Sequence, residues 1–119
     1  MQVEFCESPR ATLGVEWELA LVDPESGDLV SRAPHVLDAL RPTEAGAHPR
    51  VTHELMLSAV ELVTGICRNA GEAADDLAES LDEVRTVCSR LGVDLMCAGS
   101  HPFARWSDQQ VTEGSATPP

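Results

Sequence analysis

The sequence predicts a single α+β domain with one long helix and several short strands. Three patterns predict this fold class: apolar and polar residues alternate from Thr12 to Val22, apolar residues recur every three or four positions from Asn69 to Leu91, and a short apolar run extends from Val93 to Ala98. A chain of 119 residues is long enough to bury one modest core but not two. We therefore expect one domain.

Strict alternation in the first pattern predicts a strand with two unlike faces. One face carries the larger apolar side chains, namely Leu13, Val15, Trp17, Leu19 and Leu21. The other face carries Gly14, Glu16, Glu18, Ala20 and Val22. The segment from Asp23 to Asp28 gathers Pro, Ser and Gly, so it predicts a turn and a returning strand near Leu29.

The long helix has a start signal and a stop signal. Asn69 and Glu72 have the spacing of an N-cap and its capping-box partner, and Gly92 follows the last periodic residue. The apolar residues Leu77, Leu81 and Val84 are expected to form its buried stripe, packed on the sheet face that carries Val15, Trp17 and Leu19. By contrast, the segment 51–65 fits neither period, so a helix and a pair of strands both remain open there.

Charge and cysteine spacing exclude several classes of function. The chain has 20 acidic residues and 8 basic ones, a net charge of −12, which opposes binding to nucleic acid and to anionic membranes. The region from Met1 to Leu13 lacks the cationic end and apolar stretch of an export signal, so a cytoplasmic location is expected. The four cysteines form no C-x-x-C pair and are interpreted as reduced thiols.

Four glutamates and one histidine are the candidate site residues. Glu16 and Glu18 share one face of the predicted strand, with their side chains roughly 7 Å apart. Glu54 and Glu61 converge if 51–65 forms two strands, and His101 lies in a Gly-Ser-His-Pro turn. Ordinary solvated charges and a turn-stabilising histidine are the plain alternatives. Taken together, four carboxylates and an imidazole suit one or two hard cations such as Mg²⁺ held against phosphate oxygens.

Three sequence blocks carry a resemblance to a known family. The blocks are LGVEWELALVDPESGDL, HELMLSAVELVTGIC and GVDLMCAGSHPFARWSD, and they span roughly Thr12 to Asp108. In this order and spacing they resemble the N-terminal part of the bacterial glutamate-cysteine ligase type 2 family, which are ATP-dependent carboxylate-amine ligases. The resemblance divides the chain into a catalytic-domain portion at 1–110 and an unpatterned tail at 111–119.

The family resemblance implies a fold and a ligand set. It implies a partial antiparallel sheet of a glutamine synthetase-like funnel, with a covering helix at about 69–91, and it favours two strands in 51–65. Glu16 and Glu18 match the acids of the first strand, and Glu54 and Glu61 match those of the next strand pair. All four are expected to bind Mg²⁺. His101 matches the histidine of the family's G-[ST]-H-P turn, so it is expected to contact the metal or the ATP phosphates.

The implied reaction joins glutamate to an amine such as cysteine, with ATP as co-substrate, as in the biosynthesis of glutathione-type thiols. Family members are about three times longer, so the chain is expected to be an N-terminal fragment that is inactive by itself, either self-associating or lacking a C-terminal half. Trp17 stands where many relatives carry another acid, a departure expected to affect substrate choice.

Two other functional classes remain open. One is a non-catalytic acidic module that binds a partner chain through open sheet edges, and the other is a small metal-dependent hydrolase. Magnesium-dependent nucleotide binding distinguishes the ligase from the module, because the module does not need it.

Overall fold

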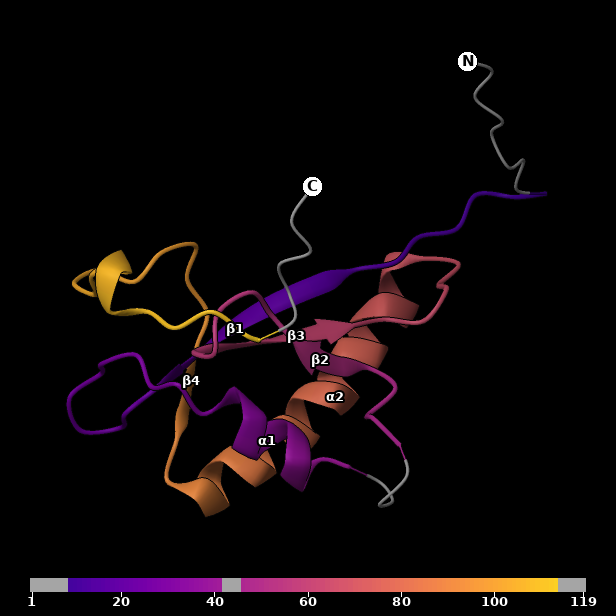
Figure 1. Cartoon of the computed structure of the whole chain (residues 1–119). Helices are drawn as coiled ribbons and strands as arrows, with labels where there is room; N and C mark the ends of the chain where they lie inside the picture. Colours follow the sequence, from indigo (N-terminus) through magenta and orange to yellow (C-terminus); the bar gives the residue numbers. More distant parts are fainter. Residues whose placement is uncertain (1–8, 42–45, 114–119) are drawn as a thin grey trace.

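The α+β class is confirmed: two helices pack against one antiparallel sheet (Figure 1). A computed structural model of the chain describes residues 9–41 and 46–113, and within these the sheet has four strands in the order β2-β3-β1-β4. In chain order the elements are β1 (Glu16–Val22), α1 (Ala33–Ala39), β2 (Val51–His53), β3 (Ala59–Val63), α2 (Ala70–Leu91), β4 (Asp94–Met96) and the 3-10 helix η1 (Trp106–Asp108).

The two central strands, β1 and β3, have the apolar face and the acidic face that the alternation predicted. In the antiparallel register of β1 and β3, Trp17 lies opposite Leu62 and Leu19 opposite Val60, whereas Glu18 lies opposite Glu61. Successive side chains of a strand point to opposite faces, so the apolar pairs and the acidic pair lie on opposite sides of the sheet. Leu19, Val60 and Leu62 are buried on their side.

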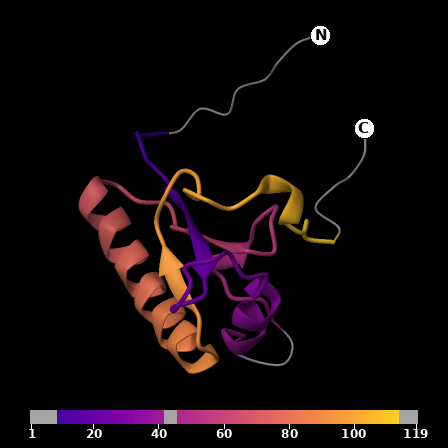
Figure 2. The ribbon, with the colours of Figure 1, turned by 90° about the vertical axis from the view of Figure 1, so that its left-hand side faces the viewer.

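Both helices cover the apolar face, as Figure 2 shows from the side. Helix α2 begins and ends where the sequence indicates: the Asn69 side chain accepts a hydrogen bond from the Glu72 N–H, and Gly92 adopts a left-handed conformation with φ of 67°. The predicted capping box is not formed as expected. In a capping box the Glu72 carboxylate would accept a hydrogen bond from the Asn69 N–H, but here it accepts from the Arg68 N–H. Thus the ends of α2 are fixed by local chemistry.

The stripe predicted for α2 is confirmed in position. Val84 is fully buried, and Leu77 and Leu81 are partly buried against the same core that holds Leu19 and Trp17. Ala73, Ser80, Val87 and Cys88 complete the buried side of the helix. Val15, which was expected to join this packing, lies before β1 and outside the buried cluster.

The ambiguous segment forms two strands, β2 and β3, joined by residues 54–58. This confirms the interpretation that the family resemblance favoured. The expected hairpin after β1 is shorter than predicted: Val22 forms an isolated bridge with Leu29, and no strand continues from it in the described residues. Most of the turn chemistry is local, because the Asp23 carboxylate accepts from the N–H groups of Glu25 and Ser26.

Residues 97–113 cross the acidic side of the sheet and return to its loop 54–58. Val111 bridges Met56, the Leu57 N–H donates to the Gln110 carbonyl at 2.9 Å, and the Thr112 N–H donates to the Leu55 carbonyl at 2.8 Å. Positions 111–113 of the predicted tail therefore belong to the fold, and 114–119 lie outside the described residues. No described helix is both long and apolar enough to traverse a bilayer.

Candidate functional site

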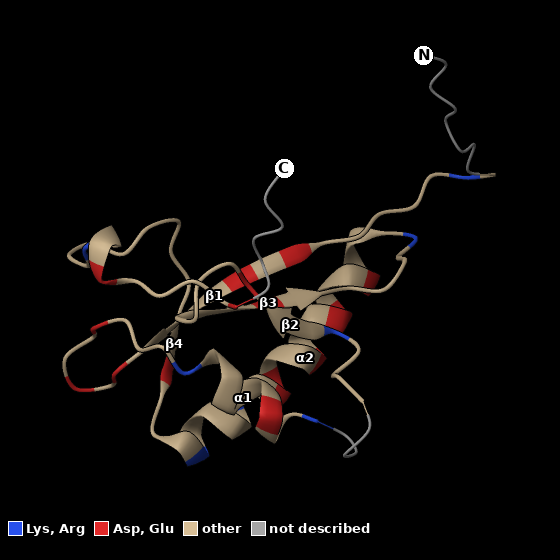
Figure 3. Cartoon of the chain, in the orientation of Figure 1, with Lys and Arg blue, Asp and Glu red and all other residues tan. Residues whose placement is uncertain are grey.

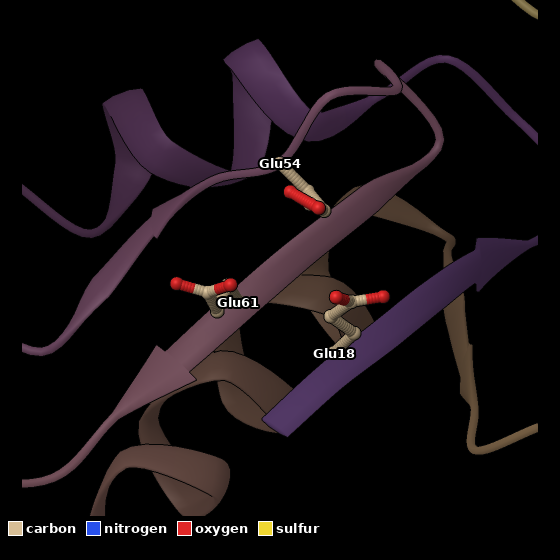
Figure 4. Close-up of side chains that lie close together, drawn as sticks. All are labelled: Glu18, Glu54 and Glu61. Carbon is tan, nitrogen blue, oxygen red and sulfur yellow. The ribbon is translucent and has the colours of Figure 1, made fainter. Parts of the chain in front are cut away.

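Three glutamates meet on the face of the sheet opposite the two helices (Figure 4). Glu18 on β1 and Glu61 on β3 are direct cross-strand partners, and Glu54 follows β2 by one residue. One oxygen from each of the three carboxylates lies within 4.8 Å of the others. Two of the four predicted acids thus meet across the sheet, and a third joins them from the adjacent loop.

Glu16 lies on the same face but outside this trio. It is opposite Val63, two positions along β1 from Glu18, as the predicted spacing requires. Its charge still acts on the site, because Glu16 is the strongest of the neighbouring carboxylates in raising the pKa of Glu61. The four predicted glutamates therefore form one electrostatic group.

Backbone contacts fix the loop that carries Glu54. Its carbonyl accepts a hydrogen bond from the Thr112 hydroxyl at 2.7 Å, and one carboxylate oxygen accepts from the Leu55 N–H at the same distance. The same carboxylate contributes an oxygen to the trio. The loop is thus held from the far end of the described chain.

The pKa of the Glu61 carboxyl is raised above its ordinary value of 4.5. Partial burial contributes most, followed by the negative charges of Glu16, Glu54 and Glu18, while nearby His53 opposes the shift slightly. Like charges directly opposite one another across two strands destabilise a sheet.

Among the described residues, the four ion pairs involve other acids, namely Asp38, Asp76, Glu72 and Glu83. Figure 3 shows acidic residues along β1 and α2.

The raised pKa of Glu61 predicts a pH-dependent stability in the absence of metal. An acid whose folded-state pKa is raised binds its proton more tightly in the folded state, so stability falls as the pH rises from about 4.5 through the folded-state pKa. We expect Glu61→Gln to raise the melting temperature at pH 7. The difference from the unmodified chain should shrink to zero as the pH is lowered toward 4.

Thermal melts of the two chains from pH 4 to pH 8, in the presence of a chelator, measure this difference. Glu25→Gln is the matched control, because Glu25 is an exposed turn residue away from the trio. A variant at Glu61 that melts like the control at every pH would contradict the electrostatic account of the site.

His101 is placed beside the trio but not within it. Its Nδ1 accepts hydrogen bonds from the N–H groups of Phe103 and Ala104, at 3.3 and 3.0 Å. Its Nε2 lies 2.7 Å from the Gly27 carbonyl oxygen, which can only accept, so Nε2 carries the proton. Both ring nitrogens are therefore engaged with backbone, and a metal or phosphate contact at His101 requires one of these bonds to be exchanged.

Trp17 lies on the opposite face from Glu16 and Glu18. Its indole N–H donates to the Cys97 sulfur at 3.2 Å, and its ring packs against the apolar core. Trp17 therefore does not share a face with the carboxylates, and any effect of Trp17 on substrate choice would have to be indirect.

A hollow of about 170 Å³ adjoins the trio. Most of the residues that line it were not predicted as site residues, because no motif in the sequence marks them. Glu18 and His101 both line it, together with Ala20, Ala59, Met56, Met96, Ser58 and Gln109. The hydroxyl of buried Ser58 donates to the Gln109 side-chain oxygen at 2.8 Å and so ties residues 97–113 to the start of β3. Ser58 and Gln109 are 51 positions apart in the chain, so only the fold reveals them as neighbours.

The fold and the site define the chain as an α+β sheet domain with a carboxylate-lined open face. Comparison with known proteins is more specific: the family model described as glutamate-cysteine ligase family 2 matches residues 12–116. The chain belongs to glutamate-cysteine ligase family 2.

Curated relatives agree with this assignment. The chain is 56% identical over 112 residues to "Putative glutamate–cysteine ligase 2-2" of Rhodococcus jostii, which covers 94% of the chain and 30% of that relative. It is 49% identical over 111 residues to "Putative glutamate–cysteine ligase 2" of Leifsonia xyli, covering 93% of the chain and 29% of the relative. The chain therefore spans less than a third of the length of these relatives.

Proposed function

We propose that this chain supplies the N-terminal, metal-binding part of an ATP-dependent carboxylate-amine ligase that joins glutamate to cysteine. The observation that carries the proposal is the convergence of Glu18, Glu54 and Glu61 on the open face of the sheet. Family membership supports the class of reaction. The glutamine synthetase-like funnel is part of the proposal, with this sheet as one portion of its wall.

The residues present fit magnesium. The trio offers oxygen ligands only, which is the donor set that Mg²⁺ prefers, and Mg²⁺ is commonly held by a few carboxylates together with substrate phosphates. The uncompensated charge beside Glu61 favours a cation at this position. In the proposal Glu18, Glu54 and Glu61 hold one cation. Glu16, two positions along β1 from Glu18, is proposed as a ligand of a second cation. A contact from His101 to the metal or the phosphates requires His101 to give up its bond to the Gly27 carbonyl.

Magnesium, when bound, would neutralise the charge that develops on the ATP phosphates during transfer. The glutamate γ-carboxylate oxygen attacks the terminal phosphorus of ATP, and the bond from that phosphorus to ADP breaks. The cysteine amine nitrogen then attacks the acyl carbon, phosphate leaves with the bonding electrons, and the amine proton passes to solvent. In the proposal the chain's acids orient the phosphates and transfer no proton. Because the reaction consumes ATP, we propose that it takes place in the cytoplasm.

The test is a chimeric enzyme in which this chain replaces the matching segment of the Rhodococcus jostii relative. We expect the chimera to release phosphate from ATP and form γ-glutamylcysteine, with both products dependent on glutamate, cysteine and Mg²⁺. The intact relative is the positive control. A folded chimera that makes no dipeptide while the intact relative does would contradict the proposed function.

The 119-residue chain by itself is expected to make no γ-glutamylcysteine. Its carboxylates lie on an open sheet face, and an acyl phosphate exposed to water is hydrolysed before an amine reaches it. The assay supplies glutamate, cysteine, ATP and Mg²⁺ and follows phosphate and dipeptide together. Dipeptide synthesis by a monodisperse preparation would show that these residues, or an oligomer of them, complete the site.

The alternative function, an acidic module that binds a partner chain, uses the edges of the sheet. The outer strands of the described sheet are β2 and β4, and each is three residues long. Such a module would bind its partner equally well with or without Mg²⁺ and ATP. Nucleotide binding by the chimera that disappears when Mg²⁺ is chelated therefore favours the ligase over the module.

A further inference from the structure

The hollow on this face of the sheet shares Glu18, but neither Glu54 nor Glu61, with the carboxylate trio. At about 170 Å³ it is well below the roughly 300–1,000 Å³ of pockets that take drug-sized ligands, a size that suits a small amino acid better than a nucleotide. Its floor is made by two alanines that face each other across the central strands, Ala20 and Ala59. Small side chains at both positions keep the space open.

The lining has a definite chemical character. Met56 and Met96 contribute apolar, polarisable thioethers, and Ser58 and Gln109 contribute polar groups. Glu18 supplies the negative charge, and neither Arg nor Lys is among the lining residues. A phosphate or the second carboxylate of glutamate would meet repulsion here, whereas an ammonium group would be attracted.

The hollow lies close enough to the trio for a ligand in it to take part in the proposed reaction. Glu18 belongs both to the trio and to the rim of the hollow, so a ligand in the hollow lies next to groups held by the trio. An adjoining hollow shares Leu29 and Gln109 with it and is lined by Arg105 together with Asp28 and Asp108. Arg105 is the cation that this region offers to the α-carboxylate of an amino acid, beside these two acids.

We infer that this hollow binds the amine acceptor of the ligase, with the acceptor's short side chain between Met56 and Met96 and its nitrogen toward Glu18. The inference rests on the proposed function and adds the location of the second substrate. In this inference four residues determine which size of acceptor side chain fits, namely Ala20, Ala59, Met56 and Met96. Of these, none is among the residues expected to bind magnesium.

The experiment fills the hollow in the chimera with Ala59→Leu and measures initial rates while L-cysteine, L-glutamate and ATP are varied one at a time. We expect the KM for cysteine to rise by about tenfold or more, because one or two misplaced methylenes in a fitted pocket change discrimination by about 10–200-fold. The KM for ATP should be unchanged. Ala74→Leu, on the exposed side of α2, is the matched control.

A second variant enlarges the hollow and guards against a misfolded first variant. With Met96→Ala we expect the ratio of kcat/KM for L-methionine to that for L-cysteine to rise by about tenfold. Circular dichroism confirms that each variant is folded, and if Ala59→Leu is not, the Met96→Ala ratio decides the inference.

The outcomes separate the inference from the proposed function. A rise in the KM for glutamate in place of cysteine, or unchanged constants and an unchanged acceptor ratio in folded variants, would overturn the inference while leaving the ligase intact. A chimera without ATP-dependent dipeptide synthesis would instead contradict the proposed function itself.

Discussion

Replacing Glu61 by Gln in the chimera is expected to reduce ATP turnover by about a hundredfold or more. Mutating residues that only orient a metal's ligands already costs about 10–100-fold in affinity or activity, so loss of a central ligand should cost at least the upper end of that range. Glu61 lies on β3, the strand between β2 and β1, and so stands between Glu18 and the loop of Glu54. Steady-state phosphate release at saturating ATP and Mg²⁺ measures the effect.

Stability and activity should change in opposite directions in this variant. Removing one of several adjacent negative charges stabilises the metal-free sheet, whereas it weakens the proposed cation site. Glu25→Gln is again the control and should leave turnover unchanged. Turnover near that of the unmodified chimera in Glu61→Gln would remove the metal-site assignment, even if the rest of the ligase proposal survived.

Leu62→Ala is expected to destabilise the chain by about 2–5 kcal/mol, the usual cost of deleting a fully buried leucine side chain. Leu62 has no exposed surface and lies on β3, with Trp17 opposite it on one side and Val51 on the other. Small domains have total stabilities of about 5–15 kcal/mol, so this variant could lose most of its folded population.

Urea unfolding followed by circular dichroism measures the change. The matched control is Leu55→Ala, the same chemical change at a position that is 48% exposed, and it should alter stability far less. Equal shifts in the two variants would show that the apolar face of the sheet is not the main core.

Local patterns predicted the elements whose chemistry is local. The alternation around Glu16 and Glu18 located β1 and its faces, and Asn69 and Gly92 located the ends of α2 to within a residue. The segment 51–65 could not be resolved from periodicity because each of its strands is short, three and five residues, and a loop that carries Glu54 separates them. There the family resemblance supplied what the pattern lacked.

The site could be predicted only in part, for a physical reason. Spacing within one strand placed Glu16 and Glu18 on one face, but the pairing of Glu18 with Glu61 depends on the register of two strands about 40 positions apart. The bonds that hold His101 to the Gly27 carbonyl and Ser58 to Gln109 are longer in range still, at 74 and 51 positions. Composition gave no indication of these contacts.

The position of β1 at the centre of the sheet has a consequence for how the chain folds during synthesis. Its partners are β3, reached at residue 63, and β4, where Met96 pairs with Ala20. Until those residues have been made, β1 has backbone groups without strand partners and an uncovered apolar side. Closing such large loops is entropically unfavourable, and folds dominated by distant pairings form slowly. Of the four described strands, β1 is made before the others and remains unpaired until β3 has been made, and newly made chains are most prone to association in that interval.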